Sequence, residues 1–397
     1  MRPNQPRPRV LMLATRIPIR VGDGTPSFVV EGTSALIDDF GITIVAPRVK
    51  GSKREDVLEG VLVRRFAYFP KRWERLADDA IVPQLGQSPL LWLQALCLTA
   101  AMLVAAHRET RRARVDLVHA QWILPAGLVA IILKGILRIP AVITARGSDV
   151  FTMNARPILR LKRRLVQRAD AVVVTSESMI APLEISGAIV QPSGVDVARW
   201  ERATSPRHPE HGIVLFVGRL ARNKGAHIAI GCLRDLPDVQ LRIIGDGPER
   251  QRLESLAHSS GVSDRVTFLG RANRVTVENE YRRAMCVVIP SLIGADGAQE
   301  GTPNVLGEAV ASGVPVVASA LSGLAELIEH EKTGLLVPPG DEESLRRALK
   351  RLVECERLRD MLSLHARTNL APRLSRQKTV VVHRELYLNL VADYANR

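Results

Sequence analysis

Short apolar runs alternate with helical patterns along this 397-residue chain, and the alternation occurs in two successive sets. Runs rich in Val, Ile and Leu that are bounded by turn residues are typical of strands buried on both faces. The first set lies at 10–15, 42–46, 61–66, 116–119, 141–144 and 171–174, and the second at 213–217, 240–244, 266–269, 286–289, 314–318 and 335–337. Strands that alternate with helices predict an α/β fold with two parallel sheets, each covered by helices on both faces.

A polar segment with two prolines, residues 201–212, separates the two sets and is typical of an interdomain linker. A chain of 397 residues is also longer than one typical hydrophobic core supports. We therefore predict a first domain at 1–205, a second domain at 206–375 and a terminal helix at 376–397.

Glu300 and Glu308 lie eight positions apart across a loop-to-helix junction, in the run EGTPNVLGE. Thr302 is a favourable N-cap and a proline follows it, so we expect the helix to begin there. The backbone N–H groups of Asn304 and Val305 would then face outward at a helix N-terminus, where anions bind. The alternative interpretation is a surface helix that contains two unrelated acids.

Arg219 and Lys224 follow the strand at 213–217, in the run FVGRLARNKG. Ligands of open α/β sheets bind at the carboxyl ends of parallel strands, where both side chains would project. Two cations there can neutralise a diphosphate leaving group through charge-assisted hydrogen bonds, without a metal. The alternative is two solvated surface charges. The run lacks the GxxxxGK[ST] spacing of an ATP-binding loop, so ATP hydrolysis is not expected.

Several motifs occur in a fixed order along nearly the whole chain. They are FVGRLARNKG (216–225), LRIIGDGPERQRLE (241–254), EGTPNVLGE (300–308) and HEKTGLLVPPGD (330–341), with weaker matches at DLVHAQW (116–122), ITARGSDV (143–150) and PSGVDVARW (192–200). Together they resemble the motifs of the retaining glycosyltransferases of family 4, also called group 1, which have the GT-B fold. The resemblance implies two Rossmann-like, doubly wound domains that face each other across a cleft. The first would bind the acceptor, the second would bind a nucleotide sugar, and the terminal helix would pack back toward the first.

The resemblance places the donor site in the second domain. The implied donor-binding residues are Gly218, Arg219, Lys224, Gly245, Gly247, Glu300, Thr302, Asn304, Val305 and Glu308. Glu308 would accept hydrogen bonds from the ribose hydroxyls, and a carboxylate with two oxygens suits a vicinal diol. Glu300 would hold the hydroxyls of the donor sugar, and together with Arg219 and Lys224 it would be catalytic. Gly245 and Gly247 would form a tight turn that lets the backbone approach the donor.

The first domain departs from the family pattern at Arg146. Family members usually have His-Gly-x-Asp near the donor sugar, whereas this chain has Arg146 in place of the histidine. An arginine donates to a sugar hydroxyl or a phosphate, but it cannot act as a general base at neutral pH. We expect Arg146 to be a fourth catalytic residue, and the alternative is a structural ion pair with Asp149. The further candidates for an acceptor or phosphate loop are Gly22, Gly24, Ser27, His119 and Asp149, although a lone His at a strand end is also commonly structural.

Positive charge is concentrated in the first half of the chain. Residues 1–205 contain 29 Lys and Arg against 18 Asp and Glu, whereas residues 206–397 contain 26 against 23. This asymmetry favours an anionic partner, such as a membrane surface, a phosphorylated acceptor or nucleic acid. Aromatic residues are only 4% of the chain and no nucleic-acid-binding motif is present, so nucleic acid is not expected. A basic face that contacts only solvent is the alternative.

The run PLLWLQALCLTAAMLVAA at 89–106 is about as long and as apolar as a membrane span. Pro89 opens the run, Gln94 and Thr99 interrupt it, and basic residues follow it directly. We expect a helix packed on the sheet, with partial insertion into a membrane interface as the alternative. The four cysteines lie far apart without CxxC spacing, which indicates reduced core thiols and a cytoplasmic protein.

These patterns predict a retaining glycosyltransferase that transfers a sugar from a UDP-, GDP- or ADP-linked donor to a hydroxyl acceptor. No cofactor and no metal are expected, because two cations take the place of a divalent ion. We expect a lipid-linked or cell-envelope glycan as the acceptor, and a peripheral position on the inner face of the plasma membrane. The alternatives are a GT-B epimerase acting on free nucleotide sugars and a non-catalytic GT-B scaffold.

Overall fold

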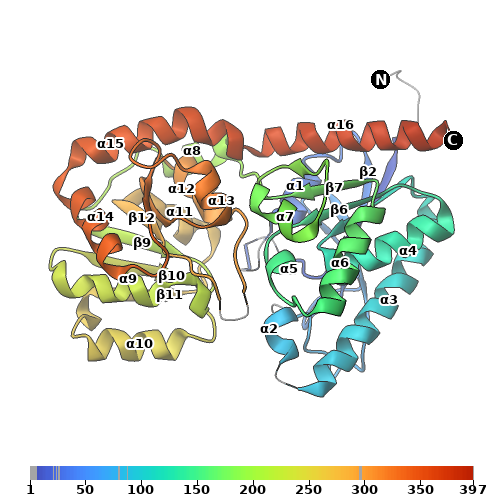
Figure 1. Ribbon diagram of the computed structural model, residues 1–397, viewed down its shortest axis with the longest axis horizontal. Coiled ribbons are helices and arrows are strands. Elements are labelled where there is room, and N and C mark those ends of the chain that lie inside the picture. The colour runs from blue at the N-terminus through green and yellow to red at the C-terminus, as the bar shows by residue number, and fades with distance from the viewer. Residues whose placement is uncertain are drawn as a thin grey trace. The chain divides into compact units, whose positions relative to one another are not determined.

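The chain forms two compact units, each with its own sheet and hydrophobic core (Figure 1). The computed structural model describes residues 7–20, 22, 23, 25, 27–78, 81–86, 88–294 and 297–396. Unit 1 comprises Met1–Thr175, Met179–Gln191 and Thr379–Arg397, and unit 2 comprises Ser176–Ser178 and Pro192–Lys378. Each unit is an α/β domain with a largely parallel sheet, which confirms the predicted fold class.

The sheet of unit 1 has the strand order β3-β4-β2-β1-β5-β6-β7-β8. Its strands are β1 Arg9–Ala14, β2 Gly41–Pro47, β3 Glu55–Leu58, β4 Val61–Phe66, β5 Leu117–Gln121, β6 Ala141–Ala145, β7 Ala171–Val174 and β8 Ile189–Val190. In the central strand β1, Leu11 lies opposite Thr43 of β2 and Val118 of β5, and both pairings are parallel. The six predicted strands are confirmed, whereas β3 and β8 were not predicted. Strand β3 is polar because it pairs antiparallel with β4 at the edge of the sheet.

Helices cover both faces of the unit 1 sheet. They are α1 Phe28–Ser34, α2 Ile81–Leu85, α3 Pro89–Ala113, η1 Ile123–Gly127, α4 Leu128–Leu137, α5 Ser148–Phe151, α6 Arg156–Arg168, α7 Ile180–Leu183 and α16 Arg376–Ala395. The short helix η2 Glu177–Met179 lies mostly in the three-residue segment Ser176–Ser178, which belongs to unit 2. Helices α3, α4 and α6 contribute buried side chains to the core on one face, including Met102, Leu133 and Leu165. Helices α1 and α16 cover the other face, where Tyr387 of α16 is fully buried against the ring of Phe40.

Unit 2 has a six-stranded parallel sheet in the order β11-β10-β9-β12-β13-β14. Its strands are β9 Ile213–Val217, β10 Gln240–Ile244, β11 Val266–Gly270, β12 Cys286–Ile289, β13 Val316–Ser319 and β14 Leu335–Val337, and all six were predicted. Its helices are α8 Val197–Thr204, η3 Arg222–Lys224, α9 Ala226–Cys232, η4 Leu233–Asp235, α10 Arg250–Ser259, η5 Ser263–Arg265, α11 Arg274–Arg283, α12 Asn304–Ala311, α13 Ser322–Leu327, α14 Glu342–Glu354, α15 Glu356–His365, η6 Ala366–Leu370 and η7 Ala371–Leu374. Helices α9, α10 and α14 contribute to the core on one face, and α11, α12 and α13 to the core on the other.

The chain passes between the units at positions that differ from the predicted boundaries. Apart from the three residues Ser176–Ser178, the chain enters unit 2 at Gln191 and Pro192, whereas the predicted boundary lies between 205 and 206. The reason is helix α8, which packs against α11 and α12 and places Trp200 against the core of unit 2. The return passage lies at Lys378 and Thr379, so all but the first turn of α16 belongs to unit 1.

Helix α3 confirms the helix expected at 89–106, but only part of its surface is buried. It is apolar and long enough to cross a membrane by composition alone, and 28% of its apolar stretch is buried. The expectation of four core thiols is wrong for Cys355, which is exposed, whereas Cys232 and Cys286 are buried and Cys97 is half-buried. Cys355 is exposed because it lies in the turn between α14 and α15.

Candidate functional site

The loops after β9 and β12 meet through a charged contact in unit 2. These strands are neighbours in the parallel sheet, so both loops leave the same edge. The ammonium of Lys224 pairs with one oxygen of the Glu300 carboxylate, and Ser291 Oγ donates to the other at 2.9 Å. The backbone N–H of Leu292 also donates to the Asn223 carbonyl at 2.7 Å. Two of the four residues expected to be catalytic, Lys224 and Glu300, are therefore in direct contact.

Gly225 allows the close approach of these two loops. It has a φ of 73°, and a Cβ at this position would overlap the carbonyl oxygen of Pro290. Another residue type would be strained by the positive φ and would push the loop after β9 away from the loop after β12. The glycine that follows Lys224 is therefore a geometric requirement of the Lys224–Glu300 contact.

The surroundings of Lys224 lower its pKa. Burial among protein atoms, together with the nearby positive charge of Arg219, lowers the pKa of the Lys224 ammonium to about 8. The side chain is still about one quarter exposed, so it is accessible from solvent. A lysine of this kind gains most from a bound polyanion, because the added negative charge favours its protonated form.

The glycine turn after β10 supports the loop that holds Arg219. Gly245 has a φ of 140°, and a Cβ there would overlap the carbonyl oxygen of Gly218. A Cβ on Gly247 would likewise meet the carbonyl of Leu220. Hydrogen bonds from Gly218 N to Ile244 O and from Leu220 N to Asp246 O join the two segments. In the structure these glycines therefore make room for the protein's own backbone.

Glu308 is held by a tyrosine that the sequence analysis did not single out. The hydroxyl of Tyr281, on α11, donates to Glu308 Oε2 at 2.9 Å. Tyr281 is fully buried and Trp200 packs edge-on against its ring. Burial raises the pKa of Tyr281 well above its usual value, so the hydroxyl remains a donor at neutral pH. No local pattern marks Tyr281, because its partner is distant in sequence.

The start of α12 differs from the prediction. The helix begins at Asn304, and Pro303 occupies the N-cap position with an extended ψ of 137°. Thr302 does not cap the helix; it is buried and packs against Gly323 of α13, where a Cβ would meet its hydroxyl. Asn304 and Val305 form the first turn, and the N–H of Leu306 donates to the Pro303 carbonyl at 3.1 Å. The helix N-terminus thus lies one residue later than expected.

In unit 1, Arg146 follows β6 and lies over an aromatic ring. Its guanidinium donates to the amide oxygen of Gln121 on β5 and lies 4.4 Å from the centre of the Phe28 ring. Burial lowers the pKa of Arg146 to about 10, so the group remains charged at neutral pH. Asp149 is buried and accepts the backbone N–H groups of Arg146, Gly147 and Ile123 at 2.9, 3.0 and 3.1 Å. Asp149 therefore positions the Arg146 backbone rather than forming part of an exposed acceptor loop.

His119 is buried, as the structural alternative for a lone histidine at a strand end predicts. Its side chain is fully buried, with Nδ1 at 2.5 Å from the hydroxyl of Tyr387 and Nε2 at 2.7 Å from that of Thr144. Burial lowers the pKa of His119 well below its usual value, so the imidazole is neutral at pH 7. Its physical role is to join β5 to the terminal helix α16.

The predicted loop after β1 lies partly within the described residues. Gly22 has a φ of 89° in a turn that Asp23 stabilises by accepting the N–H groups of Ile19 and Thr25. Ser27 precedes α1 and donates to Glu31 at 2.6 Å. Gly24 lies outside the described residues.

Comparison with known proteins identifies the family. Residues 199–369 match the family described as glycosyl transferases group 1, and residues 32–199 match the glycosyl transferase 4-like domain. Sucrose-phosphate synthase from Thermosynechococcus elongatus has a similar structure, with a TM-score of 0.78 at 22% identity over 98% of this chain and 100% of that chain. Anabaena HepE, solved with UDP, has a TM-score of 0.70 at 20% identity over 96% and 100% of the two chains. This chain therefore belongs to the group 1, family 4-like glycosyltransferases and has the GT-B fold.

Two relatives by sequence have names that refer to polysaccharide biosynthesis. An Escherichia coli glycosyltransferase assigned to colanic acid biosynthesis is 32% identical over 242 residues, which is 57% of this chain and 58% of that protein. The amylovoran biosynthesis glycosyltransferase of Erwinia amylovora is 37% identical over 147 residues, which is 36% of each chain. The chain thus spans less than two thirds of the length of these relatives.

The environment of Lys224 predicts a measurable titration. Carbon-13 NMR of the labelled lysines, with the signal assigned from its absence in Lys224→Arg, should show a pKa of about 8 for this ammonium. Arg219→Ala should raise that pKa, because a neighbouring positive charge is removed, whereas Glu300→Gln should lower it further, because the ion pair is lost. An ordinary lysine titration that Arg219→Ala does not alter would contradict this description of the site.

Proposed function

We propose that this protein is a retaining glycosyltransferase that transfers a sugar from a nucleotide-diphosphate donor to a hydroxyl acceptor. The supporting observation is the edge of the unit 2 sheet where Lys224 contacts Glu300. There the loop after β9 contains Arg219 and Lys224, and the loop after β12 leads through Glu300 into the helix that contains Glu308. Family membership supports the same reaction class.

Arg219 and Lys224 are proposed to bind the diphosphate of the donor. In the reaction, the acceptor oxygen forms a bond to the anomeric carbon while the bond from that carbon to the phosphate oxygen breaks. The acceptor proton passes to the leaving diphosphate on the same face of the sugar, which retains the anomeric configuration. Negative charge grows on the diphosphate as the bond breaks, so fixed cations stabilise the transition state more than the ground state. We propose that this pair makes a divalent metal unnecessary.

Glu308 is proposed to bind the ribose of the donor nucleotide, and Glu300 its sugar. The bond from Tyr281 fixes the orientation of the Glu308 carboxylate, which lowers the entropic cost of binding a vicinal diol. Ser291 and Lys224 fix Glu300 in the same way. Uridine is the first nucleotide to test, because the structurally similar HepE was solved with UDP.

The proposed acceptor is a growing cell-envelope glycan on a lipid carrier, used at the cytoplasmic face of the membrane. The polysaccharide names of the two relatives support a glycan acceptor. The excess of Lys and Arg in residues 1–205 supports a position beside an anionic surface. Arg146, charged and partly exposed at the end of β6, is proposed to donate a hydrogen bond to the donor sugar or its phosphate.

Glu308→Ala should weaken the binding of UDP by about 1–3 kcal/mol, because a bound diol loses its acceptor. Isothermal calorimetry measures this loss, after a thermal-shift screen of UDP, GDP and ADP has identified the nucleotide. Tyr281→Phe is the matched control. It keeps the Glu308 carboxylate and removes only the hydrogen bond that orients it, so the loss of UDP affinity should be smaller. Equal UDP affinity in Glu308→Ala and the wild type would disprove the ribose assignment.

Glycosyl transfer should persist in EDTA, whereas Arg219→Ala and Lys224→Ala should each lower turnover roughly 100-fold, as the loss of one transition-state donor does. Arg222→Ala, an exposed cation in the same turn, is the control and should retain activity. Release of radiolabelled sugar to acceptor measures the rate, and the same assay without acceptor detects an epimerase as interconverted donor. Loss of activity in EDTA that magnesium restores would contradict the proposal.

Arg146→Ala should lower turnover far more than stability, because the donor loses a charged partner. Arg146→His should retain partial activity that falls as pH rises through about 6–7, since only the protonated imidazole replaces the charge. Turnover and melting temperature are measured on both variants. A lower melting temperature with unchanged turnover per folded molecule would assign Arg146 a purely structural role.

A further inference from the structure

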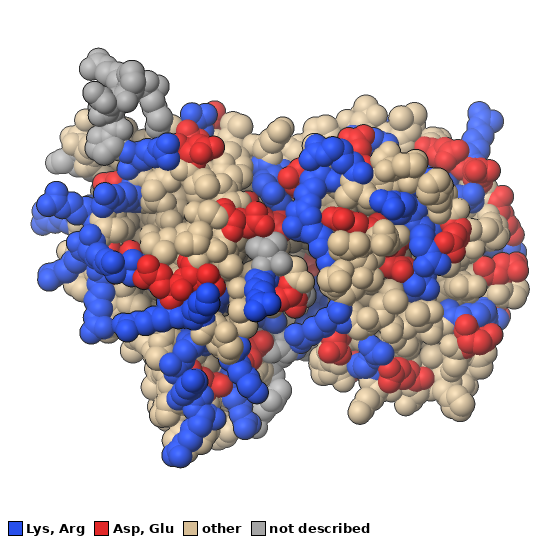
Figure 2. Space-filling model, turned by 180° about the vertical axis from the view of Figure 1, so that it is seen from behind, with Lys and Arg blue, Asp and Glu red and all other residues tan. Residues whose placement is uncertain are grey.

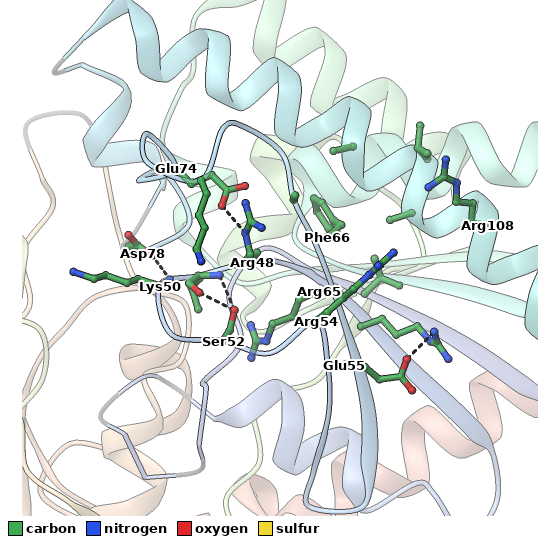
Figure 3. Close-up of a pocket in the computed structure, with 18 of the residues that line it drawn as sticks. Arg48, Lys50, Ser52, Arg54, Glu55, Arg65, Phe66, Glu74, Asp78 and Arg108 are labelled. Carbon is green, nitrogen blue, oxygen red and sulfur yellow. Dashed lines mark hydrogen bonds and ion pairs between the residues drawn. The ribbon is translucent and has the colours of Figure 1, made fainter.

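Unit 1 contains a large basic groove away from the residues assigned above. It has a volume of about 1640 Å³ and lies between the C-terminal half of α3, the strand β4 and the segments 48–55 and 71–78. Ten Lys or Arg residues line it against four Asp or Glu residues. Figure 3 shows cationic side chains entering this space from both the loop and the helix. Figure 2 shows Lys and Arg also gathered on the surface of unit 1.

Some of these cations are neutralised and form the walls of the groove. Arg48 pairs with Glu74 at 2.8 Å, and Arg64 pairs with Glu55 at 3.0 Å and with Glu109 at 3.1 Å. The first contact joins the loop after β2 to the segment 71–78, and the other two join β4 to the edge strand β3 and to helix α3. The shape of the groove is therefore fixed by ion pairs within the protein.

Other cations have no acidic partner within the part of the chain that the structure describes. Arg54, Arg108 and Arg112 are exposed, and no ion pair with a described carboxylate forms at any of them. Arg54 lies on the loop before β3, whereas Arg108 lies on α3 opposite (Figure 3). Positive charges that converge from two walls form a site for an anion with several oxygens, such as a phosphate.

An exposed apolar stripe on α3 adjoins the groove. Leu93, Leu96 and Val104 are 49%, 69% and 49% exposed, and Ala100 and Val104 line the groove itself. These positions recur at intervals of three or four residues, so they share one face of the helix, and Arg108 follows at the same spacing. Two tryptophans are also exposed: Trp73, in the segment 71–78, is 47% exposed, and Trp92, on α3, is 46% exposed. Exposed apolar surface of this kind, with basic flanks, is typical of segments that contact a membrane interface.

We propose that the groove binds the phosphate of an anionic lipid headgroup while the stripe Leu93, Leu96, Ala100 and Val104 lies against the acyl chains. A soluble phosphate compound would use the cations but leave the stripe in water, whereas a lipid contacts both. The proposal refines the membrane placement suggested above by naming the lipid class and the residues. Vesicle binding is measured without sugar transfer, so the lipid-binding proposal and the glycosyltransferase proposal can fail independently.

The test is co-sedimentation of the full-length protein with phosphatidylcholine vesicles that contain phosphatidylglycerol. The triple variant Arg54→Ala, Arg108→Ala, Arg112→Ala should lose vesicle affinity on the order of 100-fold, because each basic residue near the surface contributes roughly a factor of five. The control triple Arg156→Ala, Arg160→Ala, Arg164→Ala removes the same charge from the exposed face of α6 and should lose far less. Thermal unfolding checks that both variants fold. Equal losses of vesicle affinity in the two triple variants would disprove the groove as the lipid-binding site. The binding would then be explained by general attraction between the basic protein and the anionic surface.

A second variant separates a lipid from a soluble phosphate. Leu96→Glu should weaken vesicle binding at least tenfold, because a carboxylate in the stripe opposes both the acyl region and the anionic surface. Inorganic pyrophosphate is the soluble probe. It should raise the melting temperature of the wild type no more than it raises that of the triple variant Arg54→Ala, Arg108→Ala, Arg112→Ala. Vesicle binding unchanged by Leu96→Glu, or strong pyrophosphate binding without vesicle binding, would overturn the lipid assignment.

Discussion

The contact between Lys224 and Glu300 determines the arrangement of the charged groups in unit 2. Lys224, whose pKa is lowered, pairs with the Glu300 carboxylate, which also accepts a hydrogen bond from Ser291. This contact joins two loops from neighbouring strands. Gly225 permits the approach, and the turn at Gly245 supports the loop from the other side. Because the partners are already oriented, binding a ligand requires little reordering of side chains, and electrostatic stabilisation costs less.

The pairing of charged side chains differs between unit 2 and the groove of unit 1. In unit 2 several arginines form ion pairs with carboxylates, as in the pairs Arg242–Glu280 and Arg199–Glu278. In the groove of unit 1, cations outnumber acids and several extend toward solvent. Fixed pairs suit a site that must select one geometry of its ligand, whereas unmatched cations suit a broad anionic surface whose charges are mobile. Part of the charge excess in the first half of the sequence is thus concentrated in this groove, where ten Lys or Arg residues face four Asp or Glu residues.

The sheets and the position of the unit 2 site followed from local patterns, but several contacts did not. Strands such as β9 and β12 are continuous apolar runs because both their faces are buried, and burial is directly visible in composition. The polar edge strand β3 has no such pattern. Tyr281 and Ser291 contact their glutamates through tertiary packing, which no local spacing encodes. His119 was assigned by motif to a ligand site, yet both of its ring nitrogens lie within hydrogen-bond distance of buried side chains of the protein.

The burial of Tyr387 has a consequence for synthesis of the chain on the ribosome. Unit 1 includes the last nineteen residues, from Thr379 to Arg397, and Tyr387 fills its core beside Phe40. All of unit 2 is translated before these residues emerge, so the apolar face beneath α16 remains uncovered during that interval. A nascent chain that exposes apolar surface is prone to aggregation and is a substrate for chaperones. The order of translation therefore delays the completion of the core of unit 1 until unit 2 has been translated.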